Sequence, residues 1–120
     1  MSFRYFSLNG ELLPADQAVV PLSDIEYAYG FGVYESVRVS KGKPRFADEH
    51  CARLMLSAEA IGLAHDFTPT MVEEYIEALI AANEVDTCNL KIMLIGGKTP
   101  HLYIQCLAPR FVDRKLYKTG

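Results

Sequence analysis

Residues 33–39 have the sequence VYESVRV, in which small apolar residues alternate with polar or aromatic ones. A period of two is typical of a β-strand whose faces differ, because successive side chains point to opposite sides of the sheet. One face would carry Val33, Glu35, Val37 and Val39. The opposite face would carry Tyr34, Ser36 and Arg38 together. The pattern therefore predicts a strand with two distinct surfaces.

Further strand segments lie toward both ends of the chain. Four stretches have the apolar or aromatic composition of strands, namely residues 3–8, 11–13, 90–95 and 101–107. Asn9-Gly10, between the first two, is a strong signal for a tight hairpin turn. Residues 41–44 are expected to turn the chain after the strand at 33–39, with a brief return at 45–46.

Two segments between these strands have helical periodicity. In the first, Asp48 is expected to cap the start and Gly62 to lie just past the end. Its apolar face would consist of Cys51, Leu54, Met55, Ala58 and Ile61. The second helix starts at Thr68-Pro69 or, one step later, at a capping box formed by Thr70 and Glu73. Its buried stripe would consist of Val72, Tyr75, Ile76, Leu79 and Ile80.

The order of these elements predicts the fold class. Strands grouped around two consecutive helices favour an α+β domain, a two-layer sandwich of an antiparallel sheet with both helices on one face. The length of 120 residues allows one compact domain. We expect that domain to span residues 1–108, because residues 109–120 are charged and lack a clear period.

Composition excludes several classes of partner. The net charge is -3 with both signs interspersed, which argues against nucleic acid and membrane-surface binding. No apolar run approaches the length of a membrane span. Three cysteines without C-x-x-C spacing indicate a reduced, cytoplasmic protein. His50, His65 and His101 have no metal-ligand spacing, so no metal site is expected.

Several motifs occur in a specific order. They are Asn9-Gly10-Glu11, Asp24, YGFGVYESVR at 29–38, EHCARL at 49–54, and Ser57-Ala58. Together they closely resemble the opening of the class IV aminotransferases, which depend on pyridoxal phosphate. Residues 90–107 resemble the closing hairpin of that family's small N-terminal domain, and the branched-chain enzymes are the nearest subfamily. The resemblance implies the small domain at 1–108, the start of an interdomain linker at 109–120, and a larger catalytic domain outside this chain.

The resemblance also implies an activity. The parent protein would transfer an amino group between a small, branched-chain amino acid and a 2-oxo acid, using pyridoxal phosphate, as a homodimer. Two relatives remain as alternatives, a D-amino-acid aminotransferase and aminodeoxychorismate lyase. An alternative of another class is a non-catalytic dimerisation or ligand-binding domain. The lysine that holds the cofactor belongs to the family's larger domain, so no catalytic residue is expected in this chain, which alone would be inactive.

Candidate site residues follow from the same match. Arg53 occupies the place of the family's phosphate-binding arginine, a planar cation suited to oxyanions. Spacing alone would instead pair it on the helix surface with Glu49. His50, in the same motif, is a weaker candidate that would orient Arg53 through a hydrogen bond. The implied substrate residues are Tyr29, Tyr34, Ser36, Arg38 and Lys91. Without the resemblance, the face with Tyr34 would be read as solvated or covered by a partner.

Three features depart from the family pattern or stay ambiguous. Phe31 lies between two glycines where many relatives have a small or acidic residue, and its ring is expected to reshape the pocket floor. Lys91 stands where branched-chain enzymes often have an arginine, and it cannot grip a carboxylate in a bidentate way. Gly96-Gly97 is explained equally well by a simple hairpin turn and by backbone approach to substrate.

Overall fold

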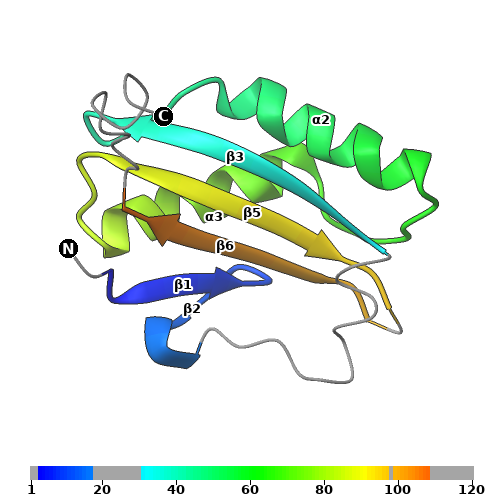
Figure 1. Cartoon of the computed structure of the whole chain (residues 1–120), viewed down its shortest axis with the longest axis horizontal. Helices are drawn as coiled ribbons and strands as arrows, with labels where there is room; N and C mark the ends of the chain where they lie inside the picture. The colour runs from blue at the N-terminus through cyan, green and yellow to red at the C-terminus, as the bar shows by residue number, and fades with distance from the viewer. Residues whose placement is uncertain (1–2, 18–30, 98, 109–120) are drawn as a thin grey trace, which may run out of the picture.

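The computed structural model describes residues 3–17, 31–97 and 99–108. Its elements are β1 (Tyr5–Leu8), β2 (Glu11–Pro14), the 3-10 helix η1 (Ala15–Gln17), β3 (Gly32–Ser40), β4 (Lys43–Pro44), α2 (Ala47–Ala60), α3 (Pro69–Ala82), β5 (Cys88–Ile95) and β6 (His101–Leu107). The strands form one sheet in the order β2-β1-β6-β5-β3-β4, and every pairing is antiparallel (Figure 1).

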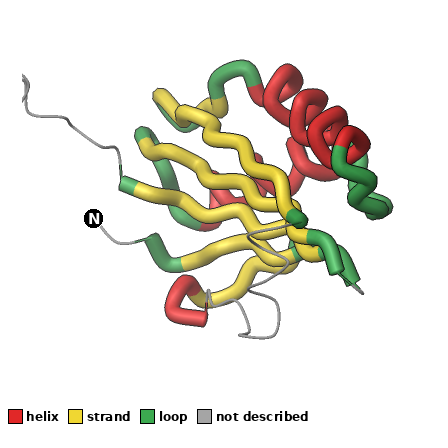
Figure 2. The backbone as a smooth tube through the Cα atoms, turned by 45° about the vertical axis from the view of Figure 1, so that its right-hand side comes forward, coloured by secondary structure: helices red, strands yellow, loops and turns green. Residues whose placement is uncertain are grey.

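The two helices cover one face of this sheet, so the molecule has two layers (Figure 2). The main core lies between the layers. Leu54, Val72 and Ile76 enter it from the helices, and Val37 and Ile92 enter it from the strands. All five side chains are fully buried. The predicted α+β sandwich, with both helices on one face of an antiparallel sheet, is confirmed.

The N-terminal hairpin forms as its sequence predicts. Asn9 and Gly10 both have positive φ, 53° and 89°, which is the backbone of a two-residue turn whose twist matches the strands. A Cβ atom at Gly10 would also come within 2.5 Å of the Tyr75 ring of α3. Glycine is therefore required there by both turn geometry and packing.

The connection from β3 to α2 differs from the sequence prediction. Lys41 and Gly42 form the turn after β3 with positive φ angles. The returning strand is therefore Lys43–Pro44 rather than residues 45–46. Pro44 is tolerated there because β4 is an edge strand. Phe46, not Asp48, is the N-cap of α2, with left-handed backbone angles (φ 56°, ψ 37°) and no side-chain capping bond. Asp48 lies in the first helical turn, where its negative charge suits the positive end of the helix dipole.

Helix α3 begins at the first of the two predicted starts. The Oγ1 atom of Thr68 accepts a 3.2 Å hydrogen bond from the backbone N–H of Met71, and Pro69 opens the helix. At its other end, Asn83 ties α3 to β1, because its side-chain amide accepts from the Tyr5 N–H (2.9 Å) and donates to the Tyr5 carbonyl (3.0 Å). The helix thereby bridges the N-terminal hairpin and the rest of the sheet.

The position of the Phe31 ring explains why residue 96 is a glycine. The backbone N–H of Gly96 donates to the Phe31 carbonyl at 2.8 Å, and a Cβ atom at Gly96 would come within 2.2 Å of the Phe31 ring. That ring packs against the main core. Gly96 is thus needed for packing, and the ring contributes to the interior of the domain.

Two further findings concern the rest of the chain. Cys51, Cys88 and Cys106 are free and buried, as small apolar residues commonly are. No helix in the described ranges is long and apolar enough to cross a membrane.

Candidate functional site

Glu35 is the one buried carboxylate of the described residues, with 9% of its surface exposed. It lies on β3, in line with the buried Val33 and Val37, and so points toward the helix layer. Arg53 of α2 meets it with a forked contact. Its Nε donates to both carboxylate oxygens at 3.1 Å, and its Nη2 donates to Oε1 at 2.7 Å. This geometry is that of a strong, charge-assisted arginine–carboxylate pair.

His50 binds the same carboxylate. Its Nδ1 lies 2.7 Å from Oε1 of Glu35, and it precedes Arg53 by three residues, on the same side of α2. Because an ionised carboxylate only accepts, Nδ1 carries the proton in this arrangement. His50 Nδ1 and Arg53 Nη2 lie 3.3 Å apart, because both donate to the same acceptor, Oε1 of Glu35. We call Glu35, His50 and Arg53 the Glu35 cluster.

Hydrogen bonds and positive charge keep the Glu35 carboxylate ionised at neutral pH. Burial alone would raise the pKa of Glu35, but the hydrogen bonds and positive charges of Arg53 and His50 outweigh it and lower the pKa. The hydrogen bond to Glu35 raises the pKa of Arg53 further. Arg53 is therefore paired with Glu35 rather than with Glu49, whose contribution is a more distant charge.

The Arg53 side chain remains available to another anion. It is 64% exposed, and its contacts with Glu35 and His50 use Nε and Nη2. The two N–H groups of Nη1 take no part in those contacts. A planar cation with unused donors, fixed at its base by a carboxylate, fits a phosphate group.

The predicted substrate residues of β3 share the other face of the sheet. Tyr34 is 48% exposed, and Ser36 and Arg38 are exposed beside it. Lys91 of β5 pairs in register with Ser36, and its Nζ lies 5.8 Å from the centre of the Tyr34 ring. We call this surface the open face. It brings together four of the five predicted substrate residues, whereas Tyr29 lies outside the described residues.

A concavity of about 350 Å³ lies at the edge where the two groups meet. Its lining consists of Ser36, Arg38, Arg45, Phe46 and His50. Ser36 and Arg38 belong to the open face, and His50 belongs to the Glu35 cluster. The concavity therefore places the predicted substrate surface next to His50, which shares the Glu35 carboxylate with Arg53.

The sequence prediction missed three residues of this site, namely Glu35, Arg45 and Phe46. A signal for Glu35 was present, since a carboxylate on the apolar side of an alternating strand must find a buried partner. Arg45 had no such signal, because its position depends on how the chain leaves β4 and enters α2.

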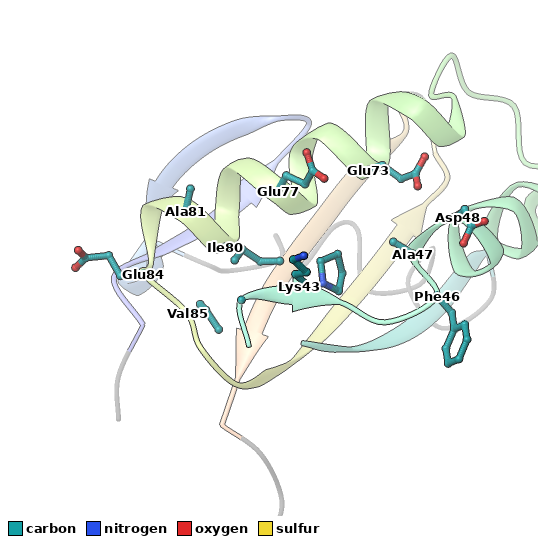
Figure 3. Close-up of a pocket in the computed structure, with 12 residues that line it drawn as sticks. Lys43, Phe46, Ala47, Asp48, Glu73, Glu77, Ile80, Ala81, Glu84 and Val85 are labelled. Atoms are coloured by element: carbon teal, nitrogen blue, oxygen red, sulfur yellow. The ribbon is translucent and has the colours of Figure 1, made fainter. Parts of the chain in front are cut away.

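A second cavity, of about 730 Å³, lies between α3 and the β4 connection (Figure 3). Its acidic lining residues are Asp48, Glu73, Glu77 and Glu84. None of the predicted site residues lines it. In the described ranges, no group of three or more histidine, cysteine and acidic side chains is arranged to hold a metal ion.

Comparison with known proteins identifies relatives of one enzyme class. Residues 32–113 match the family model described as "Amino-transferase class IV". The chain is 33% identical over 104 residues to D-alanine aminotransferase of Bacillus licheniformis, covering 85% of this chain and 37% of that protein. It is 34% identical over 90 residues to D-alanine aminotransferase of Listeria monocytogenes, covering 75% of this chain and 31% of that protein.

Solved structures that share this fold include branched-chain aminotransferases. The enzyme of Escherichia coli superposes with a TM-score of 0.81 at 19% identity, over 90% of this chain and 42% of that one. The holo-form of the Thermobaculum terrenum enzyme, with pyridoxal phosphate, superposes with a TM-score of 0.79 at 21% identity, over 93% of this chain and 41% of that one. The chain thus spans well under half the length of these relatives.

Proposed function

The chain belongs to the class IV aminotransferases, and on that premise we propose that its protein transfers an amino group between a small amino acid and a 2-oxo acid with pyridoxal phosphate. The observation that carries the proposal is the largely exposed side chain of Arg53, held in place by the buried carboxylate of Glu35. Residues 1–108 are proposed as the small domain, and a larger domain is proposed to supply the lysine that holds the cofactor.

Each residue of the Glu35 cluster has a proposed task. When bound, pyridoxal phosphate supplies an electron sink for breaking bonds at the amino-acid α-carbon. Arg53 would bind its phosphate through Nη1, while Glu35 holds Nε and Nη2 and so fixes the guanidinium plane. His50 would act as a positioning residue, since it shares the Oε1 acceptor with Arg53. Such preorganisation reduces the entropy lost when the phosphate binds.

The open face is proposed as one wall of the substrate pocket. Tyr34 would give an aromatic surface for a small side chain, with Ser36, Arg38 and Lys91 as polar partners for substrate carboxylates. Tyr29 is added to this wall on the resemblance alone. The proposal includes a homodimer, in keeping with the family resemblance, and a cytoplasmic location, in keeping with the three free cysteines.

Two classes of amino donor are candidates, branched-chain L-amino acids and D-alanine, and a different observation favours each. The fold is shared with branched-chain enzymes. On the sequence resemblance, Tyr29, Tyr34 and Arg38 match pocket residues of that subfamily. The relatives at 33–34% identity are D-alanine aminotransferases, which favours D-alanine. A donor panel containing L-leucine, L-valine and D-alanine, assayed on the protein that contains this chain, distinguishes them. Release of product from aminodeoxychorismate without transamination would refute the transferase proposal in favour of the lyase.

The cofactor part of the proposal is tested by replacing Arg53. In Arg53→Ala, the affinity for pyridoxal phosphate is expected to fall roughly tenfold to a hundredfold, as the loss of a charged hydrogen-bonding partner predicts. Calorimetry measures the change, with Arg4→Ala as the control because Arg4 is an exposed arginine away from the site. Equal affinities of the two variants would contradict the proposal and favour a non-catalytic domain.

A further inference from the structure

Asn9 holds the N-terminal hairpin against the middle of the sheet. Its backbone N–H donates to the Leu102 carbonyl at 2.9 Å, and its side-chain Oδ1 accepts from the Leu102 N–H at 2.8 Å. Its Nδ2 lies 3.3 Å from Nδ1 of His101, where the amide is the donor and the neutral imidazole is the acceptor. The backbone and the side chain of one residue thus bind two neighbouring residues of β6.

These contacts extend a short strand pairing. β1 pairs with β6 at two positions, Ser7 with Ile104 and Leu8 with Tyr103 (Figure 1). Asn9 continues this ladder by one residue, with a side-chain oxygen in place of a backbone carbonyl. The turn itself needs no such contacts, since its requirement is a backbone with positive φ. The amide group of Asn9 therefore has a second task, which is to dock the hairpin.

Asn9 is also the asparagine of this sequence that is most prone to deamidation, because a glycine follows it. Asparagine is a thermolabile residue. The backbone nitrogen of the next residue attacks Cγ and closes a five-membered succinimide, while the Cγ–Nδ2 bond breaks and ammonia leaves. Water then opens the ring to aspartate or isoaspartate. Glycine favours the attack, since it has no Cβ to obstruct its nitrogen and has a permissive backbone. The other two asparagines, Asn83 and Asn89, are followed by Glu84 and Leu90.

We propose that Asn9 is a deamidation site that the docked hairpin protects and whose modification releases the hairpin. Ring closure needs the side-chain amide to turn onto the Gly10 nitrogen, and that motion breaks its contacts with Leu102 and His101. The Tyr75 ring covers the same backbone, because a Cβ atom at Gly10 would lie 2.5 Å from it. Deamidation therefore proceeds from the opened hairpin, which is a local unfolding event.

Both products lose part of the docking contact. Aspartate keeps an oxygen for the Leu102 N–H, but it replaces the donor to His101 by a second acceptor. Isoaspartate lengthens the main chain at the turn by one carbon, so the paired residues of β1 and β2 no longer lie opposite each other. The other anchor of β1, from Asn83 to Tyr5, lies at the far end of the strand and does not replace these contacts.

Peptide mapping by mass spectrometry on the protein that contains this chain tests the protection. The protein is incubated at neutral pH, either folded or in urea, and conversion of each asparagine is followed over time. In urea we expect Asn9 to convert while Asn83 and Asn89, the internal controls, do not. In the folded protein Asn9 should convert at least about tenfold more slowly, as local protection predicts. Equal rates in the two conditions would overturn the protection.

His101→Ala is a sharper test, because it removes one of the side-chain contacts. Conversion of Asn9 in the folded protein should rise about fivefold, since loss of one hydrogen bond raises the population of the open hairpin. His101→Gln keeps an acceptor and should bring the rate back toward the native one. His65→Ala, which removes a histidine between the two helices, is the matched control and should have no effect. Slower conversion in His101→Ala would show that the contacts activate the amide, and the same rate in both alanine variants would show that they do not protect it. Either result would refute the proposal.

Asn9→Asp reproduces one product without incubation and tests the release of the hairpin. Amide hydrogen exchange should become about fivefold faster in β1 and β2, as the loss of one hydrogen bond predicts. Amides of the β3–β5 ladder, such as those of Val37 and Leu90, should keep their protection. Unchanged exchange in β1 would contradict the release. Equally faster exchange in β3 and β5 would contradict it too, because residue 9 would then stabilise the whole domain.

Discussion

The two faces of β3 are built from one stretch of sequence and are suited to different tasks. The helix-covered face carries three valines and Glu35, all of them buried. The open face carries Tyr34, Ser36 and Arg38, all of them exposed. Alternation along one strand thus separates the residues that stabilise the domain from those that are available to a ligand.

Glu35 is the exception to this division, because it is a charged residue on the apolar face. Its burial is compensated by Arg53 and His50, and no buried side-chain nitrogen or oxygen in the described ranges lacks a partner. A buried carboxylate that fixes a largely exposed arginine connects the interior to the surface. A polar residue on the core side of a strand can thus serve a site on the helix above it.

The largest expected effect contrasts the core with the open face. Leu54→Ala removes a fully buried side chain and should lower the free energy of unfolding by about 2–5 kcal/mol. Tyr34→Ala, on the open face, should change it by less than about 1 kcal/mol. Urea denaturation followed by circular dichroism measures both values. Similar losses in the two variants would show that the open face is also part of the folding core.

A smaller effect is expected on cofactor affinity when Glu35 is replaced. Glu35→Gln keeps the size of the side chain but removes the charge that fixes Arg53, so the affinity for pyridoxal phosphate should fall roughly threefold to tenfold. Because Glu35 acts through Arg53, the double variant Glu35→Gln/Arg53→Ala should bind no more weakly than Arg53→Ala alone. Additive losses in calorimetry would mean that Glu35 acts independently of Arg53.

The pH dependence of stability tests the same carboxylate. The pKa of Glu35 is lowered on folding from an ordinary value of 4.5. Its contribution to stability is therefore complete above pH 4.5 and is lost as the pH falls through the lowered pKa. The difference in unfolding free energy between the native sequence and Glu35→Gln should shrink between pH 6 and pH 3. A difference that grows on acidification would contradict the ionised pair.

The smallest effect concerns a thiol beneath the Glu35 cluster. Burial, followed by the negative charges of Glu73, Asp48 and Glu35, raises the pKa of Cys51 to about 11. At pH 8 the thiol should therefore react with a disulfide reagent far more slowly than in the unfolded chain. Spectrophotometric titration in buffer and in urea measures both rates. Equal rates would show that α2 opens readily from the sheet.

Much of the fold followed from local pattern. The alternation in β3, the Asn9-Gly10 turn and the Thr68 cap predict their elements because each depends on neighbours in sequence. The start of α2 was predicted wrongly. The cap there is set by the two-residue strand β4, which brings Phe46 rather than Asp48 to the helix entrance.

The candidate site was only partly predictable. The strand period placed Tyr34, Ser36 and Arg38 on one face, and the motif match singled out Arg53. The partner of Arg53 was not predicted, because Glu35 lies 18 residues earlier and meets it only when α2 packs across β3. Arg45 and the concavity likewise depend on tertiary packing, which no spacing in the sequence encodes.

A crystal structure of the protein with pyridoxal phosphate would show directly what Arg53 binds. The claim is that Arg53, held by Glu35, is the phosphate-binding arginine of this domain. We expect a phosphate oxygen within hydrogen-bonding distance of Arg53 Nη1, with Glu35 still bound to Nε and Nη2. A phosphate bound away from Arg53, with the Arg53–Glu35 pair facing only solvent, would contradict it.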